Sequence, residues 1–255
     1  MTNKEMLCTA LKQSALELNC TVDNLTSGKS KAVISSTAEG ARKYLSLPFY
    51  CQLVSYGSGI VASVNEEIYA DAKAYIEKYA PEHCFETPNM LVLQSALERR
   101  GMSACFMAEY WLCDTDAIRM IDCGYELRLL TAEDFAPLYT PQWSNALCEK
   151  RKELDVLGIG AYDGEKLVGL AGCSADCESM WQIGVDVLPE YRRRGIASAV
   201  TSRLAAEIMA RGKVPFYCCA WSNVASARNA IRAGFRPAWV ELTAKSAEYT
   251  ADMNK

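Results

Sequence analysis

One stretch constrains the fold of this chain more than any other, because a strand pattern, a short basic turn and an amphipathic helix follow one another without a break. Residues 181–187 place an apolar side chain at every second position, which is typical of a β-strand. From Ile196 an apolar residue recurs at every fourth position as far as Ile208, and Gly212 then supplies a stop. The stretch therefore predicts a strand, a turn and a helix that begins near residue 196.

The turn before this helix has the composition of an anion-binding site. The first N–H groups of a helix have no partner inside it, and the aligned peptide dipoles place about half a positive charge there. Gly195 has no Cβ and Ala197 has only a methyl group, so a phosphate can approach the backbone closely. A nucleotide pyrophosphate needs this geometry, whereas the alternative interpretation is a solvated basic turn. The residues of the turn are Arg192, Arg193, Arg194, Gly195, Ile196, Ala197 and Ser198.

The order of these motifs resembles that of the GNAT N-acetyltransferase superfamily. The spacing Arg-x-x-Gly-x-Ala matches its Arg/Gln-x-x-Gly-x-Gly/Ala signature, a Val-x-Val strand end precedes it, and Asn-Val-Ala-Ser and Gly-Phe follow downstream. The resemblance covers about residues 125–245. It implies an α/β (α+β) fold, the GNAT acyl-CoA N-acyltransferase fold, in which a mixed, splayed sheet is flanked by helices. The matching residues are Arg192, Gly195, Ala197, Val185, Val187, Asn223, Ser226, Gly234 and Phe235.

The same resemblance implies an enzyme that moves an acetyl group from acetyl-CoA to a primary amine, with a small-molecule amine as the expected acceptor. The pantetheine arm of CoA would enter where the central strand diverges from its neighbour and would pair with the backbone of Val185 and Val187. The pyrophosphate would lie on the amides of residues 193–198. Asn223 would contact the cofactor arm, or would only cap its helix.

The catalytic residues are less sharply indicated. Many members of the superfamily carry a tyrosine seven residues after the asparagine, to protonate the departing thiolate, but this chain has Ala230 there. A thiolate with a pKa of about 8.5 is a fair leaving group in water, so solvent can supply that proton. Deprotonating an amine with a pKa of about 10 is the harder of the two proton transfers at neutral pH. A carboxylate or a bound water should therefore remove its proton. Asp186 is the first candidate for this base, Glu178 and Asp176 are further candidates, and a structural carboxylate is the alternative for each.

The fuller pattern is similar to that of two-part GNAT proteins such as the zwittermicin A resistance acetyltransferase group. We therefore expect two domains, residues 1–124 and 125–255, joined by a linker at residues 114–124. The first domain should contain a hairpin at 57–59 and a short strand at 82–86 between two helices. This order is similar to part of a GNAT core, but no Arg-x-x-Gly-x-Ala turn occurs in it, so we expect a degenerate half without a cofactor site.

Charge and hydropathy argue against several function classes. The chain has 27 Lys and Arg against 31 Asp and Glu, and the whole deficit lies in residues 1–124. We therefore expect no nucleic-acid partner, and the acidic half mildly favours a cationic one.

No apolar run approaches the roughly 20 residues of a membrane span and no secretory signal opens the chain, so we expect a cytoplasmic protein without a membrane partner. The twelve cysteines and the single His83 lack the spacing of zinc ligands, so we expect no metal and reduced thiols.

Three functions remain open from the sequence alone. The first is acetyl transfer to a small-molecule amine, the second is a non-catalytic acyl-CoA-binding or sensing module, and the third is acetylation of a basic peptide. The missing tyrosine supports the second, and the acidic first half supports the third. The oligomeric state is not fixed by the sequence, and a homodimer is compatible with it.

Overall fold

The computed structural model describes all 255 residues, which form an α+β fold with a mixed sheet flanked by helices. The chain makes two compact units, and neither follows chain order. The first unit comprises Met1–Thr9 and Trp111–Pro237, and the second comprises Ala10–Tyr110 and Ala238–Lys255. The boundary predicted between residues 124 and 125 therefore falls inside the first unit.

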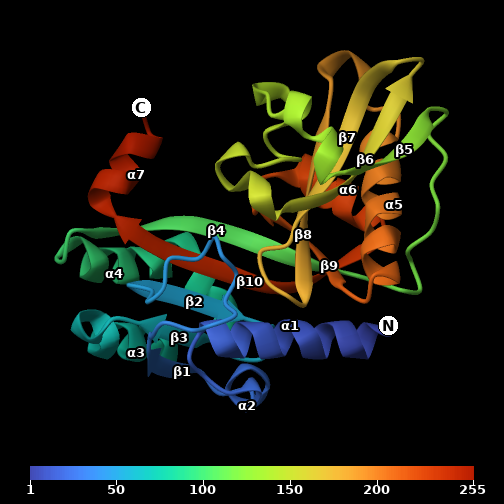
Figure 1. Cartoon of the computed structure of the whole chain (residues 1–255). Coiled ribbons are helices and arrows are strands. Elements are labelled where there is room, and N and C mark those ends of the chain that lie inside the picture. Colours follow the sequence, from blue (N-terminus) through green and yellow to red (C-terminus); the bar gives the residue numbers. More distant parts are fainter. The chain divides into compact units, whose positions relative to one another are not determined.

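The first unit (Figure 1) is built on five strands and two helices. These are β5 (Glu126–Thr131), β6 (Asp155–Asp163), β7 (Lys166–Ser174), β8 (Met180–Val187), α5 (Ile196–Ala210), β9 (Val214–Ala220) and α6 (Val224–Arg232). The strand order is β5-β6-β7-β8-β9, antiparallel as far as β8 and parallel between β8 and β9. Strands β6 and β7 form a hairpin across Asp163-Gly164, and the predicted strand, turn and helix are β8 and α5.

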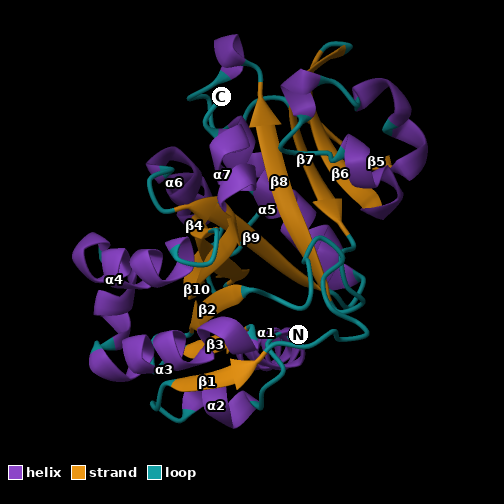
Figure 2. Ribbon diagram, turned by 90° about the vertical axis from the view of Figure 1, so that its left-hand side faces the viewer, coloured by secondary structure: helices purple, strands orange, loops and turns teal.

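The central strand β8 meets different elements on its two faces. A Cβ built on Gly184 would overlap the carbonyl oxygen of Asn145, so the even-numbered residues of β8 face the segment between β5 and β6. A Cβ built on Gly169 of β7 would overlap Ile196 and contact Val187, so the odd-numbered residues face α5. Figure 2 shows β6, β7 and β8 side by side in the first unit.

Strands β8 and β9 pair only over their first halves. The parallel register runs from Met180 with Val214 to Ile183 with Tyr217 and ends there. The divergence predicted for these two strands is therefore confirmed, and we call its starting point, just beyond Ile183 and Tyr217, the fork.

The segment predicted to be a linker packs against the first unit instead of running free. The backbone N–H of Asp114 donates to the carbonyl of Gly234 at 2.8 Å, and the Asn3 amide donates to the Asp114 carboxylate at 2.8 Å. Farther along, the Ser202 hydroxyl of α5 donates to the carbonyl of Arg119 at 2.5 Å. These bonds hold the segment on α5 and beside Gly234.

The second unit contains five helices or parts of helices and five strands or parts of strands in addition to short turns. Its elements are the end of α1 (Asn3–Glu17), α2 (Val22–Thr26), β1 (Lys31–Ile34), β2 (Cys51–Ser55), β3 (Val61–Val64), α3 (Tyr69–Lys78), α4 (Thr87–Glu98), most of β4 (Met102–Cys113) and of β10 (Phe235–Ser246), and α7 (Ala247–Met253). Its strand order is β1-β3-β2-β10-β4, and the predicted hairpin is confirmed as β2 and β3. Apolar residues of β2, β3, α3 and α4 form its core, as Leu53, Ile76 and Leu97 illustrate.

One local prediction was wrong. The short strand expected at 82–86 is a 3-10 helix, Pro81–Phe85, whose proline suits the first helical position and whose Cys84 carbonyl accepts the Tyr75 hydroxyl at 2.8 Å. In the first unit, Glu149–Leu154 form a further 3-10 turn.

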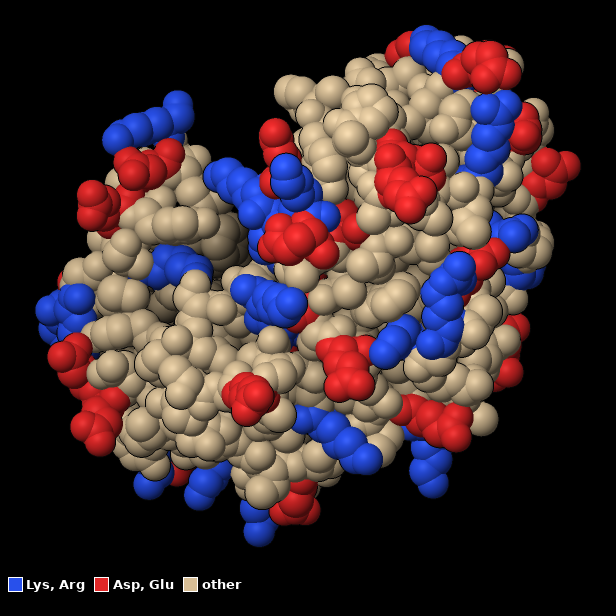
Figure 3. Space-filling view, in the orientation of Figure 1, with Lys and Arg blue, Asp and Glu red and all other residues tan.

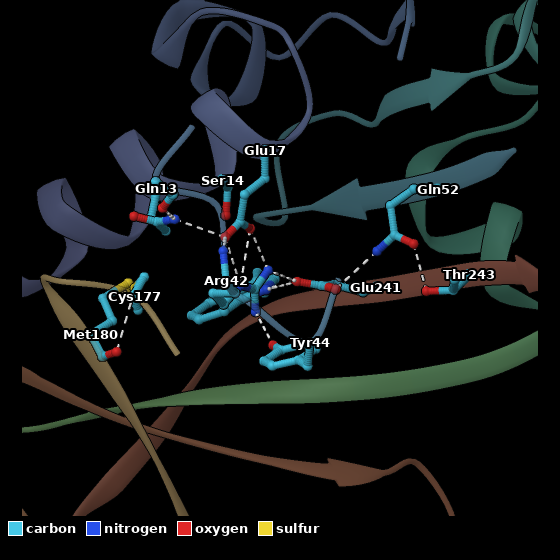
Figure 4. A network of polar contacts seen from close by, with 12 residues as sticks. Gln13, Ser14, Glu17, Arg42, Tyr44, Gln52, Cys177, Met180, Glu241 and Thr243 are labelled. Atoms are coloured by element: carbon cyan, nitrogen blue, oxygen red, sulfur yellow. Dashed lines mark hydrogen bonds and ion pairs between the residues drawn. The ribbon is translucent and has the colours of Figure 1, made fainter. Parts of the chain in front are cut away.

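A buried ion-pair network lies in the second unit (Figure 4). The Arg42 guanidinium donates to Glu17 at 2.6 Å and to Glu241 at 3.0 Å, and all three side chains are at least 95% buried. Gln52 and Trp239 donate to the Glu241 carboxylate at 2.9 and 2.8 Å. Because every charged group has a partner, the network ties α1 and β10 to the loop that carries Arg42.

The charge of the surface and the apolar character of the helices are relevant to the expected absence of nucleic-acid and membrane partners. On the face drawn in Figure 3, basic and acidic side chains are intermixed among neutral residues, so this face has no extended field of one sign. No helix combines the length and the apolar character that crossing a membrane requires. All twelve cysteines are free thiols.

Candidate functional site

The turn between β8 and α5 leaves a run of backbone N–H groups without partners. A 3-10 turn, Pro189–Tyr191, follows β8, and Arg192 N still donates to the carbonyl of Pro189. The next backbone donor in use is Ala199, which donates to the carbonyl of Gly195 at 3.1 Å. The six N–H groups of residues 193–198 therefore donate no hydrogen bond, and the last three of them lie in the first turn of α5, a helix of 15 residues.

The backbone of this turn is shaped for an anion. Arg193 has φ 66° and Gly195 has φ 84°, both in the left-handed region, and such alternation turns successive N–H groups toward one side. Gly195 caps α5 without a side-chain hydrogen bond, and a Cβ built on it would meet nothing within 4 Å. The helix dipole adds its positive end at the same place. The predicted phosphate cradle is thus open and rich in donors.

The three arginines of the turn differ in how they are held. Arg192 donates from Nε to the carbonyl of Val187 at 3.1 Å. Arg194 donates to the Tyr125 hydroxyl at 2.8 Å and to a backbone carbonyl at 3.0 Å, and it stacks on Tyr191 at 5.0 Å. Arg193 is exposed and has no partner in the structure, so it is the arginine most able to turn toward a bound anion.

We expect Arg193→Gln to weaken acetyl-CoA binding by about tenfold at low salt, because a charge-assisted bond to phosphate is lost. Arg194→Gln should weaken acetyl-CoA binding less than threefold, because the Arg194 guanidinium already donates hydrogen bonds to Tyr125 and to the backbone. Titration calorimetry at two salt concentrations measures both. Equal losses in the two variants would contradict the division of roles.

The open edge of β8 lies beside this cradle. Leu188 donates its N–H to the carbonyl of Val168 on β7, so the alternate residues Val185 and Val187 direct their backbone groups away from β7. On that side no strand pairs with β8 beyond Ile183. Backbone donors and acceptors at Val185 and Val187 are therefore available next to the fork, apart from the Val187 carbonyl that accepts Arg192.

Asn223 and Ala230 lie on α6. The Asn223 side chain accepts the backbone N–H of Ser226 at 3.1 Å, so its predicted cap is confirmed. Ala230 is fully buried, so a tyrosine introduced there would have to displace its neighbours. Sequence reasoning missed a polar network that joins α5, α6 and β9, made by Tyr217, Ser226, Asn229, Ser198 and Thr201.

The three candidate carboxylates lie in different surroundings. Both oxygens of Asp186 are engaged, by the backbone N–H groups of Asn145 and Ala146 at 2.8 and 2.9 Å and by the Asn145 side-chain amide at 2.6 Å. Asp176 is fully buried and accepts from Arg151 and Ser174. Glu178 is exposed in the turn before β8. A base role for Asp186 or Glu178 stays a prediction.

Asp186 holds residues Trp143–Cys148, which we call the strap, and sequence reasoning missed this attachment. Trp143, Ala146 and Leu147 of the strap are buried in a small apolar cluster with Phe135 and Leu170. At its end the Cys148 N–H donates to the Asp155 carboxylate at 2.8 Å. The strap is thus fixed on the even-numbered face of β8.

Asp155 has an unusual titration. It is 2% exposed, and burial raises the pKa of its carboxyl to about 6, although the Cys148 N–H and the Tyr139 hydroxyl oppose the shift. The folded state therefore binds the Asp155 proton more tightly than the unfolded state, and the stability that this proton brings is lost as the pH rises from about 4 to about 6.

We expect Asp155→Asn to remove this pH dependence while keeping an acceptor for Cys148. Relative to the parent, the variant should gain up to about 3 kcal/mol in free energy of unfolding between pH 4 and pH 7. Urea unfolding of both proteins at several pH values tests this. A difference in stability that does not change with pH would contradict the assignment.

Three comparisons with solved structures relate the chain to distant proteins. A protein of the GNAT family from Novosphingobium aromaticivorans is 23% identical, with a TM-score of 0.45 over 56% of this chain and 66% of the other. A GNAT acetyltransferase from Colwellia psychrerythraea is 18% identical, with a TM-score of 0.42 over 56% of this chain and 57% of the other. A Salmonella typhimurium protein solved with acetyl-CoA is 18% identical, with a TM-score of 0.35 over 48% of this chain and 93% of the other.

The chain thus spans less than two thirds of the Novosphingobium and Colwellia proteins. No curated protein matches its sequence. The family model of the GNAT acetyltransferase matches residues 107–238, a range that contains β5 to β9, the fork and the cradle. Because this match covers more than half of its residues, the chain belongs to the GNAT acetyltransferase family.

Proposed function

We propose that this protein transfers an acetyl group from acetyl-CoA to a primary amine of a small molecule. The observation that carries the proposal is the run of six unpaired N–H groups at residues 193–198, at the positive end of α5. Membership of the GNAT acetyltransferase family supports it. The similarity to the zwittermicin A resistance group belongs to the same proposal and does not name the amine.

Two parts of the first unit fit acetyl-CoA. The six N–H groups and Arg193 suit the pyrophosphate, since charge-assisted bonds to backbone N–H groups are short and strong. The open edge of β8 at Val185 and Val187 offers backbone groups to the amides of the pantetheine arm, and Asn223 lies at the start of α6. When bound, acetyl-CoA supplies an acetyl group activated as a thioester.

The residues of the chain must also prepare the amine. At neutral pH an amine with a pKa of about 10 is almost fully protonated and cannot attack. Asp186 or Glu178 would take its proton, and Asp186 would do so beside the three hydrogen bonds that its oxygens already accept. A desolvated pocket would lower the pKa of the amine and reduce the need for a base.

Thermal unfolding with acetyl-CoA, followed by thiol release with a panel of small amines, tests the proposal. Acetyl-CoA at 100 times its Kd should stabilise the fold by about 2.7 kcal/mol, and at least one small amine should be acetylated. Binding without turnover would favour the sensing module, and turnover with basic peptides alone would favour a protein acetyltransferase. No stabilisation by acetyl-CoA would overturn the proposal.

A further inference from the structure

The strap meets the sheet through two glycines that face each other. Gly172 of β7 and Gly184 of β8 are a cross-strand pair. A Cβ on Gly184 would overlap the Asn145 carbonyl, and a Cβ on Gly172 would overlap the Ala146 carbonyl. Both neighbours are backbone atoms and cannot rotate away. Two consecutive carbonyls of the strap therefore lie directly on two paired glycines, where any other residue would displace them.

Asp186 fixes the strap from the same strand. It lies two residues after Gly184, on the same face, and receives three N–H bonds from Asn145 and Ala146. Bonds to an ionised carboxylate are about twice as strong as neutral ones. The two glycines thus allow the strap backbone to lie close against the sheet, and the Asp186 carboxylate holds it there by hydrogen bonds.

The strap crosses the sheet close to the fork. Gly184 is the first residue of β8 beyond the last pair with β9, Ile183 with Tyr217. The strap therefore crosses β8 at the fork, on the face opposite α5. Ser144 and Asn145 of the strap are exposed, so they present polar groups beside the point where a thioester would emerge from the fork.

We propose that Asp186 is a positioning residue, which holds the strap as a fixed wall of the amine site at the fork. Asp186 sets where the amine lies, and it acts through Asn145 and Ala146 rather than by taking a proton. This assignment rests on the proposed acetyl transfer. It gives Asp186 a geometric role, supported by its three hydrogen bonds to the strap, in place of proton transfer.

The test compares two variants that release the strap in different ways. Asp186→Asn removes the charge that ties it, and Gly184→Ala pushes the Asn145 carbonyl away while leaving Asp186 intact. The matched controls are Asp122→Asn, an exposed aspartate of the first unit, and Gly160→Ala, a strand glycine whose added Cβ would meet only side-chain ends. Hydrogen exchange at the Asn145 and Ala146 amides, the KM for the amine, kcat as a function of pH, and the Kd of acetyl-CoA are measured for each.

Both test variants should speed exchange at Asn145 and Ala146 at least tenfold and raise the KM for the amine about tenfold, the loss expected for one strong hydrogen bond. The Kd of acetyl-CoA should stay within twofold, and the pH at which kcat is half-maximal should not move. The controls should match the parent. If Gly184→Ala does not fold, Asn145→Asp takes its place, because it sets two carboxylates against each other on the exposed side of the strap and should speed exchange at Ala146.

Three other outcomes overturn the assignment. If Asp186→Asn lowers kcat at pH 7 and recovers at pH 9 while Gly184→Ala keeps the parent's kcat, Asp186 is the base. If exchange at Asn145 and Ala146 is unchanged in Asp186→Asn, the carboxylate does not hold the strap. If the parent itself binds no acetyl-CoA, the proposed function fails first and the assignment falls with it.

Discussion

Gly195→Glu should abolish measurable binding of acetyl-CoA. Its side chain would place a negative charge in the open space before α5, where the six free N–H groups point. Repulsion between unit charges 4 Å apart is about 4 kcal/mol at an effective dielectric of 20, so the loss of affinity should exceed a hundredfold. The fold should survive, because a carboxylate at a helix N-terminus is favourable. Titration calorimetry measures the effect.

Gly212→Glu is the matched control. Gly212 lies just beyond the other end of α5, has φ 71° and also has nothing within 4 Å of a built Cβ. The two substitutions therefore introduce the same charge and similar backbone strain at opposite ends of one helix. Gly212→Glu should bind acetyl-CoA within about twofold of the parent. Equal binding by both variants would show that the cradle at Gly195 does not hold the cofactor.

Arg42→Leu should lower the free energy of unfolding by about 3–5 kcal/mol, because it leaves the buried carboxylates of Glu17 and Glu241 without their cation. Urea unfolding, followed by a signal from the second unit, measures this loss. Adding Glu17→Gln and Glu241→Gln to Arg42→Leu should restore part of the stability, since the uncompensated charges are then removed.

Arg99→Leu provides the comparison for this prediction. Arg99 also pairs with a carboxylate, Asp71, but 62% of its side chain is exposed and Arg100 holds the same partner. Its loss should cost less than about 1 kcal/mol. If Arg42→Leu cost as little, the buried network would not be a source of stability for the second unit.

The turn before α5 could be predicted from the sequence because its determinants are local. A glycine before an apolar four-residue period defines both the left-handed cap and the start of α5, and all of these residues lie within one short stretch. The fork followed from the resemblance, and the ends of the pairing between β8 and β9 confirmed it. The role of Arg194 could not be predicted, because it depends on Tyr125, which lies 69 positions away.

The strap escaped prediction for the same reason. Its bonds to Asp186 join residues about 40 positions apart, and local periodicity carries no information about such contacts. A signal was nevertheless present. Gly172 and Gly184 stand inside strands, where glycine weakens pairing and often marks the close approach of another backbone.

The buried network and the segment at 82–86 show two further limits. Arg42 and Glu241 are separated by 199 positions, so their pairing follows from the fold alone. Residues 82–86 carry no strong pattern, and Pro81 together with the bond from Tyr75 decides for a 3-10 helix. Whether the first half of the sequence is a degenerate GNAT-like domain stays a prediction.

A crystal structure of the protein with acetyl-CoA tests the central claim most directly. The account predicts one cofactor per chain, with its pyrophosphate oxygens within hydrogen-bond distance of N–H groups from residues 193–198 and its pantetheine arm along Val185 and Val187. Every contact should come from residues after Tyr125. A pyrophosphate bound away from this turn, or a second CoA near residues 64–69, would contradict it.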